Sequence, residues 1–131
     1  MKKLIFIITA LFFLVPGLVF AAQNELKPQT NCPVMGGKID KDVYVDYQGQ
    51  RVYFCCPSCK ENFLKDPDKY FEKIEKDGVL LESVQKKCPV MGNDIDKEVF
   101  TDYKGRRVYF CCSGCIEKFK EDPEKYLEKM K

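Results

Sequence analysis

The residues of this chain best suited to chemistry are its eight cysteines, which all belong to one motif that occurs twice. Each copy has a Cys-Pro-Val-Met-Gly loop, followed further along the chain by a Phe-Cys-Cys-x-x-Cys cluster. The first copy contains Cys32, Cys55, Cys56 and Cys59, and the second, 56 positions later, contains Cys88, Cys111, Cys112 and Cys115. Because the spacings are the same in both copies, we expect these thiols to serve sulfur chemistry.

A loop and a helix N-terminus are expected to bring the thiols of each copy together around a metal ion. Cys32 lies in the loop, whereas Cys55, Cys56 and Cys59 lie where a strand is predicted to meet a helix. Backbone N–H groups and the helix dipole favour the thiolate form that binds metal, and Cys59, in the first helical turn, should feel this most. The minimum predicted site is therefore three thiolates from Cys32, the 55/56 pair and Cys59. The second copy offers the same set from Cys88, the pair Cys111 and Cys112, and Cys115.

The spacing leaves the fourth ligand open. The chain has no histidine, so a metal would be held largely by sulfur. Met35 and Met91 each follow the first cysteine of a copy by three residues, where a zinc knuckle would have its second cysteine. A thioether suits Cu(I) better than Zn(II), but methionine is also a flexible core filler. Cys56 and Cys112 are the other candidates for the fourth position, or are buried or reserve thiols.

Two other interpretations of the cysteines stay open. An exported chain with an even number of cysteines is also typical of a disulfide framework. Against it, neighbours such as Cys55 and Cys56 bridge each other only with strain, and the layout has metal-knuckle spacing. Alternatively, Cys56 with Cys59, and Cys112 with Cys115, form Cys-x-x-Cys pairs at helix starts, as in thiol oxidoreductases. The βαβ context of those enzymes is missing, however.

The chain contains an internal repeat that predicts two small domains. Residues 32–74 and 88–130, here called the first and second repeats, align without a gap and are identical at 27 of 43 positions. The expected order is a signal peptide at 1–21, a short tail at 22–30, a domain at 31–76, a linker at 77–86 and a second domain at 87–131. The apolar Val79-Leu80-Leu81 in the linker is expected to pack on one domain or between both.

Each repeat has the same order of local signals. Two runs of β-branched and aromatic residues around a glycine turn predict a β-hairpin at 43–54 and again at 99–110. A helix beginning near Pro57 should follow the cysteine cluster, and Asp66-Pro67 and Asp122-Pro123 predict the capped start of a second helix. The predicted fold class is small α+β, with each unit made of a cysteine knuckle, a β-hairpin and two short helices.

Units of this size bury little apolar surface and usually carry a metal or disulfides. The small core that shields the sulfurs is expected to come from aromatic residues of the hairpin and helices. In the first repeat these are Tyr44, Tyr47, Tyr53, Phe54, Phe63 and Tyr70.

The N-terminal segment and the charge balance bear on location and partners. Residues 1–21 begin with Lys2-Lys3, continue as an apolar run and end in small residues, as in an export signal. The alternative is an uncleaved membrane anchor. The chain has 22 basic and 20 acidic residues, so without Lys2 and Lys3 it is neutral, which is unfavourable for gripping phosphates. We expect a periplasmic or extracellular protein that binds no nucleic acid and, after signal cleavage, no membrane.

Each repeat resembles a YHS domain of the TRASH-like superfamily. The resemblance is carried by the Cys-Pro-Val-Met-Gly loop, the Tyr-x-Gly-x-x-Val-Tyr-Phe-Cys-Cys run and the following Phe-x-x-Asp-Pro-x-Lys-Tyr. It implies a treble-clef-like zinc-finger unit and a role in heavy-metal trafficking, resistance or sensing. The superfamily pattern implies Cys32, Cys55 and Cys59, with Cys88, Cys111 and Cys115, as ligands, and so favours Cys55 over Cys56. The histidine that gives the family its name is replaced here.

These features predict an exported protein without catalysis of its own that binds Cu(I), or alternatively Zn(II), for trafficking, buffering or resistance. A metal-transport or metalloenzyme protein is the expected partner. The alternatives are a structural zinc module for protein docking and a thiol–disulfide redox protein.

Overall fold

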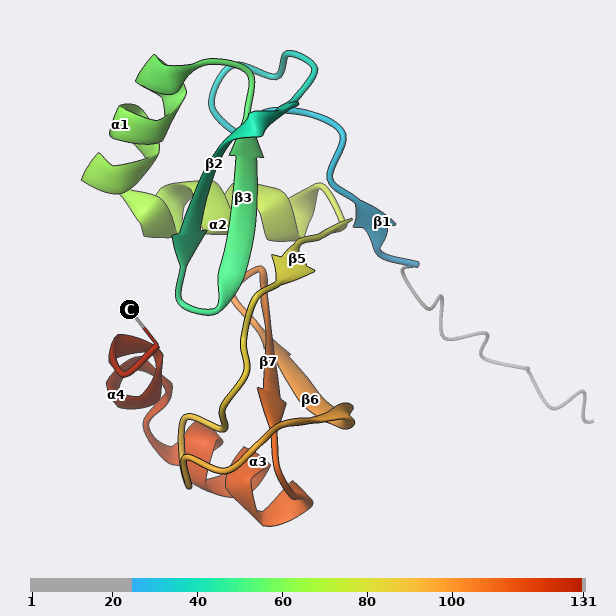
Figure 1. The fold of residues 1–131 in the computed structure, drawn as a ribbon, viewed down its shortest axis with the longest axis vertical. Coiled ribbons are helices and arrows are strands. Elements are labelled where there is room, and N and C mark those ends of the chain that lie inside the picture. Colours follow the sequence, from blue (N-terminus) through green and yellow to red (C-terminus); the bar gives the residue numbers. More distant parts are fainter. Residues whose placement is uncertain (1–24, 131) are drawn as a thin grey trace, which may run out of the picture.

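The chain folds into two repeated α+β units that lie one above the other along the long axis of the molecule (Figure 1). The structure is a computed structural model that describes residues 25–130. The predicted export signal at 1–21 lies outside the described residues. Within residues 25–130, every helix is too short or too polar to cross a membrane.

Each unit is built on the predicted β-hairpin. The strands are β2 (Asp40–Tyr47) and β3 (Gln50–Phe54) in the first repeat, and β6 (Asp96–Tyr103) and β7 (Arg106–Phe110) in the second. Gln48 and Gly49 in the first turn both have positive φ, at 48° and 77°, as the tight two-residue turns that match strand twist require. A register shift between Asp40 and Tyr44 interrupts the regular strand pairing near the cysteine end of the hairpin.

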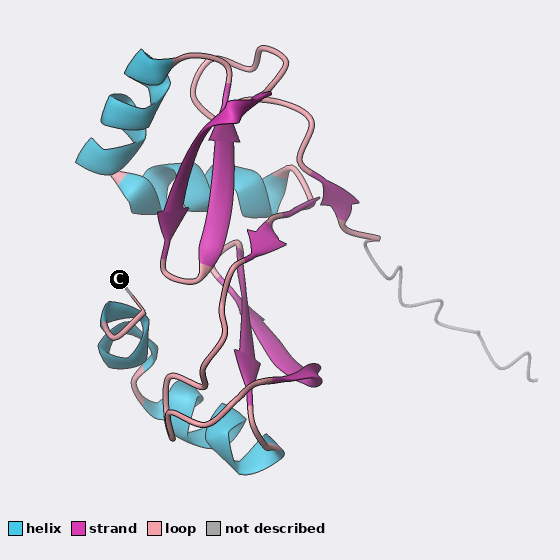
Figure 2. Cartoon of the chain, in the orientation of Figure 1, coloured by secondary structure: helices cyan, strands magenta, loops and turns pink. Residues whose placement is uncertain are grey.

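Two short helices follow each hairpin, as predicted (Figure 2). They are α1 (Pro57–Lys65) and α2 (Pro67–Lys76) in the first repeat, and α3 (Ser113–Glu121) and α4 (Pro123–Glu128) in the second. Asp66 caps α2 by accepting a hydrogen bond from the Lys69 backbone N–H at 3.4 Å, and Asp122 caps α4 in the same way. Each cap and the proline after it stop one helix and start the next, which sets the sharp corner between them.

The segments on either side of the first repeat add strands to it. Strand β1 (Lys27–Pro28) pairs in parallel with β4 (Val79–Leu80), and β5 (Glu82–Ser83) pairs with β3. Leu81, between β4 and β5, is buried in the first core. The apolar part of the linker therefore packs on the first unit, and residues 27–28 are ordered strand where the sequence indicated only a tail.

The core of each unit lies between the inner face of the hairpin and the helices. In the first repeat it consists of Cys32, Val52, Phe54, Cys59, Phe63, Phe71, Ile74 and Leu81, and in the second of Cys88, Val108, Phe110, Cys115, Phe119 and Leu127. Tyr47 and Tyr70 pack against it as expected, with Tyr47 edge-on to Phe63 at 5.9 Å between ring centroids.

The prediction that Tyr44 and Tyr53 belong to this core is wrong. Alternate residues of a strand face opposite sides of a sheet, and β3 turns Val52 and Phe54 inward. Tyr53 therefore lies on the outer face, where it pairs with Tyr44 at 6.0 Å between ring centroids, and Tyr44 is 38% exposed.

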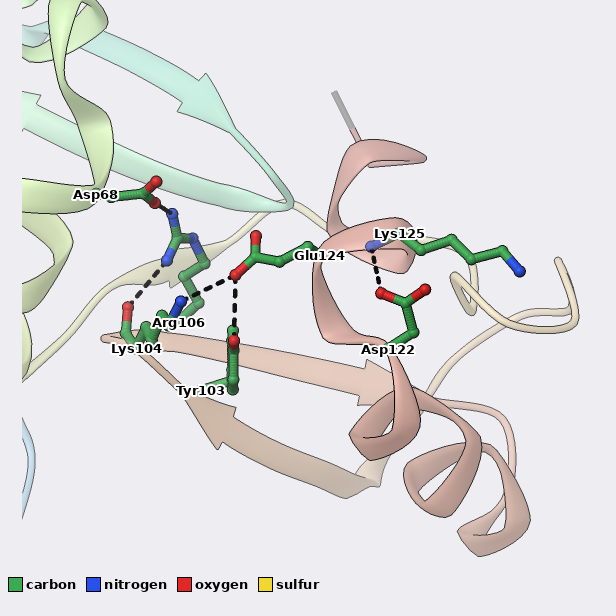
Figure 3. Close-up of polar contacts among 7 residues, drawn as sticks. All are labelled: Asp68, Tyr103, Lys104, Arg106, Asp122, Glu124 and Lys125. Atoms are coloured by element: carbon green, nitrogen blue, oxygen red, sulfur yellow. Dashed lines mark hydrogen bonds and ion pairs between the residues drawn. The ribbon is translucent and has the colours of Figure 1, made fainter.

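The two units meet where α2 of the first repeat contacts the β6–β7 turn of the second. Arg106, at the start of β7, is 1% exposed and donates to Asp68 at 2.6 Å (Figure 3). Its guanidinium carbon lies 3.7 Å from the centroid of the Phe71 ring. Gln50 of the first hairpin also donates to the backbone carbonyl of Arg107 at 2.7 Å. A buried charged residue with an ion-pair and an aromatic partner is the centre of this contact.

Candidate metal centre

Three cysteines of each repeat converge on one buried point. The sulfurs of Cys32, Cys55 and Cys59 all lie within 4.8 Å of one another, and so do those of Cys88, Cys111 and Cys115. Cys32 and Cys59 are 1% exposed, whereas Cys55 is partly exposed. The six cysteines that the superfamily pattern implies thus form two separate triads, one in each repeat. All eight cysteines lie in the described residues and have free thiols there.

The knuckle that carries Cys32 is closed by its own backbone. The N–H of Cys32 donates to the carbonyl of Gly37 at 2.7 Å, and the N–H of Gly36 donates to the carbonyl of Cys32 at 2.8 Å. Gly36 has a φ of +76°, a conformation that glycine adopts without strain. The second repeat has the same turn around Cys88 and Gly92. This tight loop points the first thiol of each triad at the end of the hairpin.

Backbone donors in the knuckle favour a thiolate at Cys32. Burial raises the pKa of this thiol, but the backbone N–H groups of Met35, Cys55 and Val34 donate to its sulfur and together hold the pKa below the ordinary value. Cys88 has the same arrangement and a lowered pKa. One member of each triad is thus prepared for metal by hydrogen bonds to its charged form.

The expectation that the helix N-terminus would favour the thiolate most at Cys59 is wrong for the metal-free protein. Burial raises the pKa of Cys59, and the neighbouring thiols of Cys56, Cys55 and Cys32 raise it further. The pKa of Cys115 in the second repeat is raised for the same reasons. The loss of water around a buried sulfur disfavours its charged form, and this is the largest cause of the raised pKa at both residues.

The adjacent cysteines, Cys56 and Cys112, lie at the rim of each triad. The Cys56 sulfur is 3.2 Å from the Cys59 sulfur and 4.0 Å from the Cys55 sulfur. The Ser58 hydroxyl and the Cys59 thiol hold the pKa of Cys56 at about 7. The Cys112 sulfur lies 3.5 Å from that of Cys115. Both rim thiols are close enough to compete for an ion held by the triad.

The methionines of the knuckles are on the surface. Met35 is 72% exposed and Met91 is 57% exposed, so neither fills the core. Met91 lines a cavity of about 380 Å³ that also borders Cys111, Cys112 and Cys115. The side chain of Met91 is therefore next to the second triad without being enclosed by it.

Two glutamines that sequence analysis missed hold the strand end before each cysteine cluster. The Gln29 side chain donates to the Tyr53 carbonyl at 2.8 Å and accepts from the Tyr53 N–H at 2.9 Å. Gln85 makes the same pair of bonds with Tyr109. Gln29 and Gln85 are 56 positions apart, like the cysteines. Extending the repeat alignment upstream of the first cysteine would have found them.

The comparisons with known proteins agree with this arrangement. A family profile described as YHS domain matches residues 31–73 and 87–130. No curated protein and no solved structure matches the chain. The two matched segments cover more than half of the chain and each contains one complete cysteine triad. The chain therefore belongs to the YHS domain family and carries two tandem copies of that domain.

Proposed function

We propose that the protein binds two soft or borderline metal ions, one at each cysteine triad, and carries or buffers them. The observation that supports this most is the convergence of three sulfurs within 4.8 Å at a buried point in both repeats. A buried thiol packs as a small apolar group wherever it lies in a core, so burial alone does not require three of them to converge. Three thiolates, in contrast, form most of the coordination shell of a soft ion.

The spacing of the sulfurs fits a metal. A tetrahedral site with metal–sulfur bonds of about 2.3 Å places its sulfurs about 3.8 Å apart. The Cys55 and Cys59 sulfurs are 3.7 Å apart, and so are those of Cys111 and Cys115. Each triad can therefore close around an ion with little rearrangement. A set of three sulfurs with an exposed methionine beside it favours Cu(I), while a fourth sulfur from Cys56 or Cys112 would suit Zn(II).

The proposed setting follows from the sequence. The export-signal pattern at 1–21 supports a periplasmic or extracellular location. A carrier of this kind would hand its ion to a metal-transport or metalloenzyme partner and would have no catalysis of its own. The ligand arrangement, with one thiol from a knuckle and two from the junction of a hairpin and a helix, supports assigning each unit to the treble-clef-like zinc fingers.

One observation favours a second function, a structural zinc module for protein docking. Cys32 and Cys59 belong to the same buried cluster as Phe54 and Phe63, so an ion held there would also be part of the core. Small domains with such sites are often unfolded without the metal.

A single titration followed by chelation tests both functions. Reduced full-length protein is titrated with Cu(I), and separately with Zn(II), without oxygen, and the carrier function predicts two ions per chain. Binding of less than one ion would exclude it. A chelator is then added while circular dichroism is recorded. Reversible loss of metal with retained secondary structure supports the carrier, whereas unfolding of both units supports the structural module.

A further inference from the structure

The two triads have the same ligands but different rims. In the first repeat, the Cys56 sulfur lies 3.2 Å from the Ser58 hydroxyl and is partly buried. In the second repeat, Gly114 stands at the position of Ser58, and Cys112 is exposed. The rim thiol therefore has a hydroxyl partner in the first repeat, whereas in the second it contacts the Cys115 thiol and is open to solvent.

A cavity leads from solvent to the second triad. It has a volume of about 380 Å³ and is lined by Met91, Cys112 and Gly114 at the rim and by Cys111 and Cys115 of the triad. The Cys112 sulfur is 3.5 Å from the Cys115 sulfur. An incoming ligand or ion can thus reach Cys112 first and the buried triad next.

The first triad is more firmly braced. The Lys73 ammonium of α2 donates to the Pro33 carbonyl in the knuckle at 3.0 Å, and α2 is held in turn by Arg106 of the second repeat. Lys129, the counterpart of Lys73, lies instead over the Tyr126 ring, 5.0 Å from its centroid. The second knuckle has a different brace, an ion pair between Lys87 and Asp94 at 2.6 Å, but both of these side chains are exposed and water weakens the pair. Opening the first knuckle therefore requires breaking a partly buried contact that the second knuckle does not have.

On the basis of the metal-binding function proposed above, we propose that the second triad is the site of ion exchange, with Cys112 as its first ligand on entry and last on exit. The Cys112 thiol loses its proton to water, and the resulting thiolate forms one sulfur–metal bond as one bond between the metal and the donor breaks. Cys115, Cys111 and Cys88 then replace the remaining donor ligands in the same manner. The oxidation state of the ion does not change. The first triad keeps its ion over the same time.

The test is the rate at which metal leaves the loaded protein. Full-length protein carrying two Cu(I) ions is mixed, without oxygen, with an excess of a chromogenic Cu(I) chelator. We expect two phases of equal amplitude whose rates differ by about tenfold or more, which corresponds to about 1.4 kcal/mol in the barrier. The double variant Cys88→Ser/Cys115→Ser should lose the fast phase, and Cys32→Ser/Cys59→Ser should lose the slow one.

Single substitutions at the rims leave both triads intact and test whether the metal leaves through Cys112. Cys112→Ser should slow the fast phase about tenfold, and Ser58→Gly should speed the slow phase. Ser113→Ala, at an exposed position beside Cys112, is the matched control and should change neither rate. These variants decide the outcome even if a double variant fails to fold.

The outcomes separate this inference from the proposed function. Two ions per chain released in one phase, a fast phase that belongs to the first triad, or a fast phase unaffected by Cys112→Ser would overturn the inference and leave metal binding intact. A chain that binds less than one ion would overturn both.

Discussion

At the residue scale, the protonation of the triad makes metal binding dependent on pH. Burial raises the pKa values of Cys55 and Cys59 above the ordinary value of 9.0, so both are protonated near neutral pH in the metal-free protein. A bound ion requires thiolates. We therefore expect at least two protons to be released per ion, and the affinity of each site to rise about 100-fold per pH unit between pH 6 and 8. Competition titrations across this range measure the slope.

Because of the same raised pKa values, the stability of the metal-free protein should fall at high pH, whereas its metal affinity rises with pH. A group with a raised pKa in the folded state stabilises the fold below its unfolded pKa, near 9.0 for a thiol, and loses that contribution as the pH rises further. The lowered pKa of Cys32 acts in the other direction, but only below the same value. The control for the metal-binding prediction is to count the protons released per ion, by calorimetric titration in two buffers of different ionisation enthalpy. An affinity that stays flat between pH 6 and 8 would contradict the protonation states described here.

The cysteine triads were the part of the site that the sequence predicted best. Spacing alone gave Cys32 and Cys59, and the family pattern gave Cys55, because regular ligand spacing is written directly in the sequence. The pKa order within the triad was not predictable, since it depends on how deeply each sulfur is buried. Tyr44 of β2 and Tyr53 of β3 were misplaced for a similar reason: side chains alternate along each strand, but which face of the hairpin is covered depends on the helices.

At the element scale, two matched helix caps are expected to contribute equally to their units. Replacing Asp66 or Asp122 with alanine removes the acceptor for the backbone N–H of Lys69 or Lys125. Each substitution should lower the free energy of unfolding by about 1 kcal/mol, measured by urea denaturation. The asparagine variants are the control, because asparagine caps as well as aspartate does. Equal losses in the alanine and asparagine variants would show that the capping bond is not the cause.

Elements with strong local signals were predicted and those without them were missed. The hairpins and helices follow from glycine turns, β-branched runs and Asp-Pro pairs. Strands β1, β4 and β5 have two residues each, too few for any periodicity. The edge of the hairpin at β3 pairs with β5, whereas β1 and β4 pair with each other. The apolar residues of the linker did predict packing on one domain or between both, and Leu81 completes the first core.

At the scale of the whole molecule, the difference between the repeats produces their contact. Gln50 and Arg106 occupy the same position in the two repeats; one donates across to the second hairpin and the other packs on α2. The contacts differ because an amide can donate to a carbonyl, whereas a guanidinium can also form an ion pair, here with Asp68. Positions at which the repeats differ were therefore the available signal for the interface, although the partners of those residues required the fold.

The turn between β6 and β7 should tolerate no side chain, because it is pressed against α2. A Cβ atom at Gly105 would overlap the backbone carbonyl oxygen of Phe71, which cannot move without disturbing the helix. Gly105 also has a φ of +73°, so alanine there would be strained as well. We expect Gly105→Ala to lower the free energy of unfolding by about 2–4 kcal/mol, combining a backbone cost of about 1–2 kcal/mol with overpacking of similar size.

The matched control for this substitution is Gly78→Ala. Gly78 has a φ of +65° but open space where its Cβ would lie, so its variant should show the backbone cost alone, about 1–2 kcal/mol. Urea denaturation of both variants gives the difference. Because Gly105 contacts α2, which in turn bonds the knuckle through Lys73, Gly105→Ala should also speed the slower phase of metal release. Equal losses of stability in the two variants would mean that the units are not packed together in solution, and the bracing of the first triad would then have to come from the first repeat alone.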